Sequence, residues 1–337
     1  MLSILLATDA DKPQVNGVVT TVYATKKEIE KMGHNCVILS PNNRKTYKTN
    51  LYPDFNICLV SQKEIGRIIK TNKITHVHIC TEGPVGLAVR LFCIKNNIRF
   101  TTSYHTRFPE YLKKMFFIPE SITYCYMKWF HKKSSRVLVP TKKMYDILYT
   151  KGFSNIKIWN RGVDTHLFKP TGNNNKEQTL IYVGRVSIEK NIEEFLRINI
   201  PNTNKIVVGD GPQLRELKNK YNKVRFVGNK TGADLVDYYN KGSVFVFPSK
   251  TDTYGLVLLE ALACGLPVVA FNEPGPVDIA ATASRFNKLN TVFISNGDLE
   301  FTTKCAMKCG CPKLCRELAE HFSWHNSTKE FIKLITL

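Results

Sequence analysis

Short apolar runs alternate with longer amphipathic segments along the first half of the chain. Five runs have the length and aliphatic content of buried strands, at residues 3–7, 35–39, 76–79, 99–102 and 136–139. Three longer segments space their apolar residues as helices do, at residues 18–32, 85–95 and 121–133. Because strands that alternate with helices build parallel sheets, this half predicts one doubly wound α/β domain.

The second half repeats this rhythm after a polar stretch, residues 169–178, whose Pro, Gly and Asn residues are typical of a linker. Its strand-like runs lie at residues 179–183, 205–208, 224–227, 244–247 and 267–270. We therefore expect an N-terminal Rossmann-like domain over 1–168 and a C-terminal one over 169–320, with a helix in 321–337 that packs back on the first. Ligands of open α/β sheets bind beyond the carboxyl ends of the strands, so we expect the chemistry in a cleft between the two domains.

The composition is that of a globular protein, with 337 residues, 43% apolar and 23% charged. A formal net charge of +20 indicates a positive surface that attracts nucleic acid, anionic lipid headgroups or phosphorylated small molecules. No dense basic tract or aromatic-basic recognition motif accompanies this charge, so we expect no specific nucleic-acid partner.

The N-terminal residues lack the basic region and the long apolar core of a signal peptide, and no run approaches 18 apolar residues. Most of the ten cysteines lie in apolar contexts that suit buried thiols, so we expect a cytoplasmic protein. Cys305, Cys309, Cys311 and Cys315 cluster without the Cys-x2-Cys spacing of common zinc sites. We expect helix there, with a zinc site as the alternative.

Three loops that follow predicted strands combine glycine with charge. Gly17 stands at a strand-to-helix turn, where the backbone can approach a phosphate, although a purely steric glycine is the alternative. Gly184 opens a loop in which Arg185 and Lys190 could converge on a diphosphate, or instead form a solvated basic face. The turn at 208–212 contains two further glycines that could bend the chain near a ligand.

A fourth loop, in TDTYGLVLLEALACGLPVV at 251–269, carries Asp252 and Glu260 around a run of small and apolar residues. Backbone amides at residues 254–256 would hold phosphate at the start of a helix, while the acids would accept hydrogen bonds from hydroxyls. A nucleotide sugar meets both requirements. Asp252 as an ordinary N-cap is the alternative, but Glu260 inside an apolar run needs a partner.

These loops together resemble the retaining glycosyltransferases of family 4, the "group 1" enzymes of GT-B fold. The family signature is an acid, seven residues, a Glu and then A-x-A-x-G-x-P-V, which here runs from Asp252 through Glu260 to Val268. Further matches are PQVNGVV near the start, TEGPVGLA at 81–88, TSYHTRFPEY at 102–111, NRGVDTHLFKP at 160–170, YVGRVSIEKN at 182–191, VGDGP at 208–212 and FSW at 322–324. TDTYG, SYHTRFPEY and RGVDT resemble the branch that holds sulfoquinovosyltransferases and GDP-mannose-dependent α-mannosyltransferases.

The resemblance implies that Arg185 and Lys190 neutralise the departing donor diphosphate. It also implies that Glu260 binds the ribose hydroxyls and Asp252 the hydroxyls of the donor sugar. His105 would lie against that sugar near the reacting carbon, with a hydrogen-bonded histidine of the cleft wall as the alternative.

Other positions would complete the two substrate sites. The acceptor would meet Tyr104, Arg107 and Glu110. The donor would contact a set of glycines and loop residues, namely Gly17, Gly184, Gly209, Asp210, Gly228, Thr253, Tyr254, Gly255 and Leu256.

We therefore expect a retaining hexosyltransferase that transfers mannose from GDP-mannose to a lipid or glycan acceptor, with no metal and no cofactor. The alternatives are a UDP-sugar-dependent sulfoquinovosyl- or glucosyltransferase that acts on diacylglycerol, and a non-catalytic nucleotide-sugar binder. The aromatic and basic residues of 113–117 and 121–133 could attach the protein to an anionic membrane surface, although burial would account for most of these aromatics.

Overall fold

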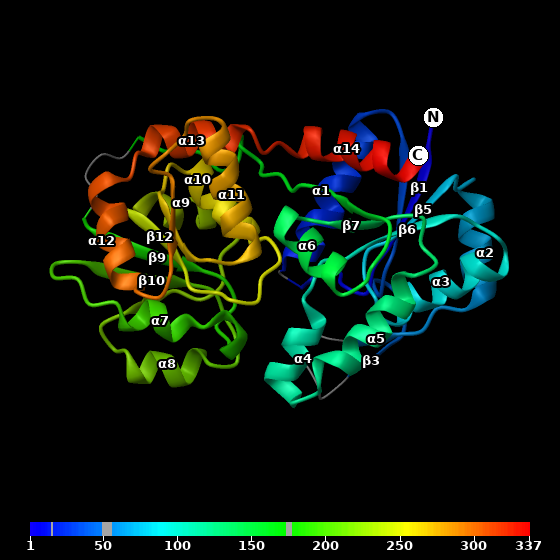
Figure 1. Ribbon diagram of the computed structural model, residues 1–337, viewed down its shortest axis with the longest axis horizontal. Coiled ribbons are helices and arrows are strands. Elements are labelled where there is room, and N and C mark those ends of the chain that lie inside the picture. The colour runs from blue at the N-terminus through cyan, green and yellow to red at the C-terminus, as the bar shows by residue number, and fades with distance from the viewer. Residues whose placement is uncertain (15, 49–55, 173–176) are drawn as a thin grey trace. The chain divides into compact units, whose positions relative to one another are not determined.

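The computed structural model describes residues 1–14, 16–48, 56–172 and 177–337. The chain divides into two compact units (Figure 1). The first unit comprises Met1–Arg161 together with Trp324–Leu337, and the second comprises Gly162–Ser323. Each unit contains one parallel sheet covered by helices, so the predicted fold class is confirmed.

The first unit is built on a six-stranded parallel sheet with the order β2-β1-β5-β6-β7-β8. Its strands are β1 (Ser3–Ala7), β2 (Asn35–Leu39), β5 (His76–Ile79), β6 (Phe100–Ser103), β7 (Val137–Val139) and β8 (Ile156–Ile158). Its helices are α1 (Gly17–Lys31), α2 (Gln62–Thr71), α3 (Pro84–Lys95), α4 (Phe108–Phe116), α5 (Glu120–His131), α6 (Lys142–Thr150) and α14 (Trp324–Thr336). A short antiparallel pair, β3 (Thr46–Lys48) and β4 (Asn56–Cys58), lies outside this sheet.

Strand β1 shows why this sheet is buried on both faces. Ile4 and Leu6 pack in one apolar cluster and Leu5 and Ala7 in another, because successive side chains of a strand point to opposite faces. All four residues are buried, so the strand is a continuous apolar run rather than an alternating one. Continuous runs of this kind made the strands recognisable in the sequence.

The C-terminal helix α14 belongs to the first unit, where it lies beside α1 (Figure 1). The Trp159 indole Nε1 donates to both the carbonyl oxygen and the Oγ of Ser327, each at 3.1 Å. Arg136 Nη1 donates to the Leu334 carbonyl at 2.7 Å. These contacts hold the last helix against strands that lie far from it in the sequence.

The second unit has a six-stranded parallel sheet with the order β11-β10-β9-β12-β13-β14. Its strands are β9 (Thr179–Val183), β10 (Asn204–Val208), β11 (Arg225–Phe226), β12 (Val244–Phe247), β13 (Val268–Phe271) and β14 (Val292–Ser295). A 3₁₀ turn, η1 (Ile188–Lys190), precedes helices α7 (Ile192–Arg197), α8 (Leu214–Lys220), α9 (Gly232–Lys241), α10 (Leu256–Ala263), α11 (Pro274–Arg285), α12 (Leu299–Cys309) and α13 (Pro312–Glu320).

The differences from the sequence prediction are local. Strands β3, β4, β8 and β14 and helices α2, α4 and α6 were not predicted individually. Three of the clustered cysteines lie in or at the ends of the predicted helices α12 and α13, and the fourth precedes α13. Much of the expected linker, residues 173–176, lies outside the described residues. In the described part of the chain, no helix is both long enough and apolar enough to cross a bilayer.

The loops that leave β9, β10 and β11 are locked together by backbone contacts. Gly184 N donates to Val208 O at 3.0 Å, and Gly209 N donates to Gly228 O at 2.9 Å. Gly209 has φ +147°, and a Cβ there would lie 1.9 Å from the Gly184 carbonyl oxygen. Only glycine fits this position, so the three loops present bare backbone at one edge of the sheet.

Gly209→Ala should therefore destabilise the protein by more than the cost of placing an alanine at this φ, because the added Cβ also overlaps the Gly184 carbonyl oxygen. Gly297 is a matched control, because its φ is +148° and a Cβ there meets nothing within 4 Å. Both substitutions carry the conformational cost of an L-residue at this φ, on the order of 1–3 kcal/mol. The added steric overlap should make Gly209→Ala worse than Gly297→Ala by at least about 2 kcal/mol in urea unfolding. Equal losses for the two variants would contradict the close approach of the loops.

Candidate functional site

A basic and an acidic residue of the second unit meet at the carboxyl end of its sheet. Lys190 Nζ lies 2.7 Å from Asp252 Oδ1, with 24% and 21% of the two side chains exposed. Lys190 ends η1 after β9, and Asp252 follows β12. Since β9 and β12 are hydrogen-bonded neighbours, their carboxyl-terminal loops leave the sheet side by side.

Two further contacts join these loops. The Asn191 side-chain amide donates to the Pro248 carbonyl at 3.2 Å, and Thr251 Oγ1 donates to the Glu189 carbonyl at 3.1 Å. Asn191 itself has a left-handed backbone, φ +55°, which turns the chain from η1 into α7. The Lys190–Asp252 ion pair is thus flanked by fixed hydrogen bonds rather than carried by two mobile surface loops.

Arg185 begins the same loop. Its carbonyl oxygen accepts a hydrogen bond from the buried Tyr182 hydroxyl at 2.7 Å, which fixes the backbone where the side chain leaves it. The Arg185 side chain is partly exposed. The structure therefore places both predicted cations on one loop, with Lys190 held directly by an acid.

Asp252 is an ion-pair partner and not a helix cap. Helix α10 begins at Leu256, and its N-cap is Gly255, which has φ +83°. While Oδ1 of Asp252 contacts Lys190, its Oδ2 is buried and accepts no hydrogen bond from the described residues. A buried carboxylate oxygen without a donor is costly, and a ligand hydroxyl would satisfy it.

The turn before α10 is held by a close approach between backbones. A Cβ at Gly275, in the first turn of α11, would lie 1.7 Å from the Tyr254 carbonyl oxygen. Tyr254 is buried, whereas Thr253 and Leu256 are partly exposed. The first amides of α10 thus stand at a fixed place beyond β12.

Glu260 lies in α10, where Tyr239 of α9 donates its hydroxyl hydrogen to Glu260 Oε2 at 2.8 Å. Desolvation by the surrounding apolar residues raises the pKa of Glu260 to about 7, and the hydrogen bond from Tyr239 opposes that rise. Tyr239 is the partner that the sequence required for this acid but could not identify. Its Oε2 is engaged, so Oε1 is the oxygen left to accept from a ligand.

The remaining predicted donor residues of this unit lie on the glycine-locked loops. Gly184, Gly209 and Gly228 form the backbone contacts described above, and Asp210 Oδ1 accepts from the Gly211 amide at 2.7 Å. The carboxylate of Asp210 thereby stabilises its own turn.

In the first unit, Gly17 is the first residue of α1 and is exposed. The amides of Val18 and Val19, which we expected to hold phosphate, both donate to the Asn16 side chain at 3.0 Å. Asn16 is thus a conventional N-cap. A phosphate at this turn would have to displace that cap, so this part of the prediction gains no support from the local geometry.

His105 follows β6, at the carboxyl edge of the first sheet. Its Nδ1 lies 3.2 Å from Nη2 of Arg161, a residue to which the sequence analysis gave no role. Desolvation, Arg161 and His78 together lower the pKa of His105 well below its usual value.

The three predicted acceptor residues gather around Tyr124, which sequence reasoning also missed. The Tyr124 hydroxyl donates to Glu110 Oε1 at 2.9 Å, and Arg107 Nη2 lies 3.2 Å from the same oxygen. Tyr104 is fully buried, and burial together with Tyr124 and Glu110 raises the pKa of its phenol. Arg107 and Glu110 are partly exposed, so they are better placed than Tyr104 to contact a ligand directly.

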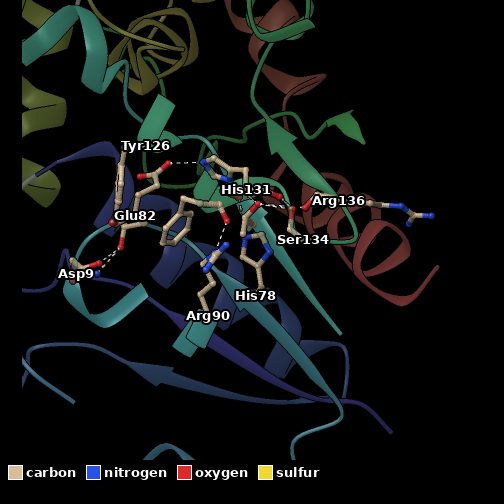
Figure 2. Close-up of polar contacts among 12 residues, drawn as sticks. Asp9, His78, Glu82, Arg90, Tyr126, His131, Ser134 and Arg136 are labelled. Atoms are coloured by element: carbon tan, nitrogen blue, oxygen red, sulfur yellow. Dashed lines mark hydrogen bonds and ion pairs between the residues drawn. The ribbon is translucent and has the colours of Figure 1, made fainter. Parts of the chain in front are cut away.

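A buried polar network supports the same edge of the sheet (Figure 2). Asp9, after β1, accepts from the Val85 amide at 2.7 Å and so caps α3. Glu82 Oε1 lies 3.2 Å from His131 Nε2, and the Glu82 carbonyl accepts from the Tyr126 hydroxyl at 2.6 Å. The acid in TEGPVG was the sequence signal for this network, but its partners come from α5.

Among the described residues, no group of three or more His, Cys, Asp and Glu side chains could hold a metal ion. The candidate site residues of the second unit are cations, acids and backbone amides.

The solved structures place this architecture in a known class. The chain matches the sucrose-phosphate synthase of Thermosynechococcus elongatus with a TM-score of 0.79 over 99% of this chain and 98% of that one, at 18% identity. The fold is that of the GT-B glycosyltransferases. In sequence, residues 163–297 match the model of the glycosyl transferases group 1, and residues 15–167 match that of Glycosyltransferase Family 4. The chain therefore belongs to the family 4, group 1 glycosyltransferases.

Characterised relatives differ in the sugar they transfer. The chain is 28% identical to the sulfoquinovosyl transferase of Arabidopsis thaliana over 75% of this chain, but it spans only 54% of that protein. It is 26% identical to the alpha-monoglucosyldiacylglycerol synthase of Streptococcus pneumoniae, over 81% of this chain and 72% of that one. It is 23% identical to a GDP-mannose-dependent alpha-mannosyltransferase of Mycobacterium tuberculosis, over 82% and 80%.

The environment of Glu260 predicts how the stability of the protein depends on pH, which can be measured without a substrate. Its pKa of about 7 in the folded protein exceeds the ordinary value of 4.5, so the folded state binds this proton more tightly than the unfolded state does. The stability of the native protein should consequently fall as pH rises through the window from about 4.5 to 7. Glu260→Gln cannot ionise, so its free energy of unfolding relative to the native protein should increase between pH 5 and pH 8.

Urea unfolding at several pH values measures that difference. Tyr239→Phe is the companion variant, because losing the hydroxyl should raise the pKa of Glu260 further and move the dependence to higher pH. A difference between Glu260→Gln and the native protein that stays constant from pH 5 to pH 8 would show that the carboxyl is not perturbed.

Proposed function

We propose that this chain is a retaining hexosyltransferase that moves mannose from GDP-mannose to a lipid or glycan acceptor without a metal ion. The observation that carries the proposal is the Lys190–Asp252 pair at the carboxyl end of β9 and β12, in which Asp252 Oδ2 is buried without a donor. A cation for a phosphate and an acid for a hydroxyl stand side by side there, as a nucleotide sugar requires.

The reaction breaks the bond between the anomeric carbon and the phosphate oxygen. Negative charge grows on the leaving diphosphate, and the fixed cations Lys190 and Arg185 would stabilise it. The acceptor hydroxyl oxygen forms the new bond on the same face of the sugar, and its proton passes to the leaving phosphate. No covalent nucleophile enters this scheme.

The two acids would bind the donor's hydroxyl groups. Asp252 Oδ2 would accept from a hydroxyl of the sugar, and Glu260 Oε1 from the ribose, while Tyr239 occupies the other oxygen of Glu260. The amides before α10 and the bare backbone at Gly184 and Gly209 would lie along the phosphates. Each group thus has a partner of matching chemistry.

Two alternatives remain for the donor and for catalysis. One alternative is a UDP-sugar-dependent sulfoquinovosyl- or glucosyltransferase that acts on diacylglycerol. The names of two relatives, a sulfoquinovosyl transferase and a monoglucosyldiacylglycerol synthase, support transfer of one of these two sugars. A non-catalytic nucleotide-sugar binder is the other alternative. The name of the mannosyltransferase supports GDP-mannose. Closely comparable identities to all three make the donor a question for direct assay.

The direct assay incubates the protein with GDP-mannose or a UDP-sugar and candidate acceptors, in the presence of EDTA. Lys190→Ala and Arg185→Ala should each lower kcat by about 10²–10³-fold, because each removes a fixed cation from the developing charge. Lys218→Ala, an exposed lysine of α8, is the matched control and should leave turnover unchanged. Absence of both transfer and donor hydrolysis with every nucleotide sugar would overturn the proposal.

Helix α5 and the segment before it carry exposed apolar residues and lysines, which suggest where a lipid acceptor would bind. In α5, the large apolar side chains of Tyr124, Met127 and Phe130 are buried on one face of the helix. Ile122, Tyr126 and Trp129 form an exposed stripe on the opposite face, and Phe117 after α4 is 89% exposed. Exposed lysines accompany them, namely Lys113, Lys114, Lys128, Lys132 and Lys133. This combination suits an anionic membrane surface that presents a lipid acceptor.

Flotation with vesicles tests this attachment. The protein should float with vesicles that contain anionic lipid and should remain behind with purely zwitterionic ones, because the lysines require negative headgroups. The double variant Phe117→Ser/Ile122→Ser should weaken flotation, whereas Tyr149→Ser, an equally exposed aromatic of α6, should not. If the double variant floats as well as Tyr149→Ser does, the surface formed by Phe117 and α5 is not the one that binds the membrane.

A further inference from the structure

Arg161 is held by Trp159 and contacts His105. The Arg161 side chain is buried, and its guanidinium carbon lies 4.2 Å from the centre of the Trp159 ring. Its Nη1 donates to the Trp159 carbonyl at 2.6 Å, while Nη2 lies 3.2 Å from His105 Nδ1. The His105 ring in turn meets Trp159 edge-on, with centroids 6.1 Å apart. Both terminal nitrogens of the guanidinium thus have a defined partner, the Trp159 carbonyl for Nη1 and His105 for Nη2.

This contact determines where the proton of His105 lies. A guanidinium has five N–H donors and no acceptor, so the Arg161–His105 hydrogen bond requires Nδ1 to accept. A neutral imidazole with an acceptor at Nδ1 carries its one hydrogen at Nε2. The contact itself therefore selects one tautomer of the neutral ring and excludes the imidazolium.

Burial and the charge of Arg161 act in the same direction, because both lower the pKa of His105. His78, on β5, is itself kept neutral: it is bonded at both nitrogens, by Thr101 and Ser103 at 2.8 Å each, and burial lowers its pKa to about 3. Glu330 of α14 faces Arg161 and partly balances its charge.

We infer that Arg161 is a positioning residue that presents His105 as a neutral hydrogen-bond donor through Nε2–H. The functional part of this inference rests on the proposed function, in which His105 lies against the donor sugar. There Nε2–H would donate to a hydroxyl oxygen of that sugar. With its lone pair at Nδ1 committed to Arg161, His105 cannot take the proton of the acceptor, and that proton is left to the leaving phosphate.

The tautomer can be tested without any substrate. Two-bond ¹H–¹⁵N spectra of protein labelled at histidine distinguish the Nε2–H tautomer, the Nδ1–H tautomer and the imidazolium, and His105→Gln identifies the signal by its absence. We expect the native ring to remain in the Nε2–H form between pH 8 and pH 5.5. In Arg161→Met, the signal should become a mixture of tautomers with a higher pKa. An Nδ1–H signal or titration near pH 6.5 in the native protein would overturn the inference.

Two substitutions of His105 test the role in transfer while leaving Arg161 intact. The Gln amide nitrogen can reach the place of Nε2, whereas the shorter Asn side chain places its amide near Nδ1. His105→Gln should therefore retain kcat/KM within about ten-fold of the native value, and His105→Asn should lose about 10²-fold or more. Equal loss in both would contradict the donor role.

The spectra and the assay separate the two hypotheses. A native protein that transfers no sugar but shows the Nε2–H signal would refute the proposed function and leave the assignment of the proton intact. Arg161→Lys adds a further check, because an ammonium is also only a donor: it should preserve the Nε2–H signal that Arg161→Met loses. Retention of the signal in both variants would mean that the fold, and not the donated hydrogen bond, selects the tautomer.

Discussion

The ion pair between Lys190 and Asp252 is the interaction on which the candidate site depends. It exists because β9 and β12 are neighbours in the second sheet, although 62 residues separate the two side chains in the chain. At partly exposed positions such a pair contributes little to stability, typically less than about 1 kcal/mol. In the proposed function, the pair instead holds the ammonium of Lys190 at one place, where it would meet a phosphate. Hydrogen bonds on both sides, from Asn191 and Thr251, serve the same end.

Glu260, the second acid of the site, reduces stability when it is charged. Glu260 sits in an apolar helix where its charge is unfavourable, and Tyr239 offsets only part of that cost. A glutamine would fit the same space without a charge penalty. The fold therefore does not explain why an acid stands here, whereas the proposed ribose of a donor would, because its hydroxyls would donate hydrogen bonds to Glu260. Functional sites commonly carry such local penalties.

The sequence predicted most of the fold because strands buried on both faces read as continuous apolar runs. It predicted the loops of the site because their glycines and charges follow those runs directly, as at Gly184 and Gly209. It could not predict pairings across space: Tyr239 for Glu260, Arg161 for His105, or His131 for Glu82 come from elements that only the tertiary structure brings together. At the turn before α1, the unpredicted partner is close in the sequence: the Asn16 side chain accepts from the amides that we expected to hold a phosphate.

Under the proposed function, the charged groups of the two units would have different chemical roles. In the second unit, Lys190 and Arg185 are cations, and Asp252 has an oxygen still able to accept. In the first unit, burial and the permanently charged Arg161 beside it both favour a neutral His105. A base for the acceptor hydroxyl must have a free lone pair, and His105 has committed the one it has to Arg161. In the proposed reaction, the leaving phosphate would gain negative charge as its bond breaks, so it would become a stronger base at the moment when the acceptor must lose its proton.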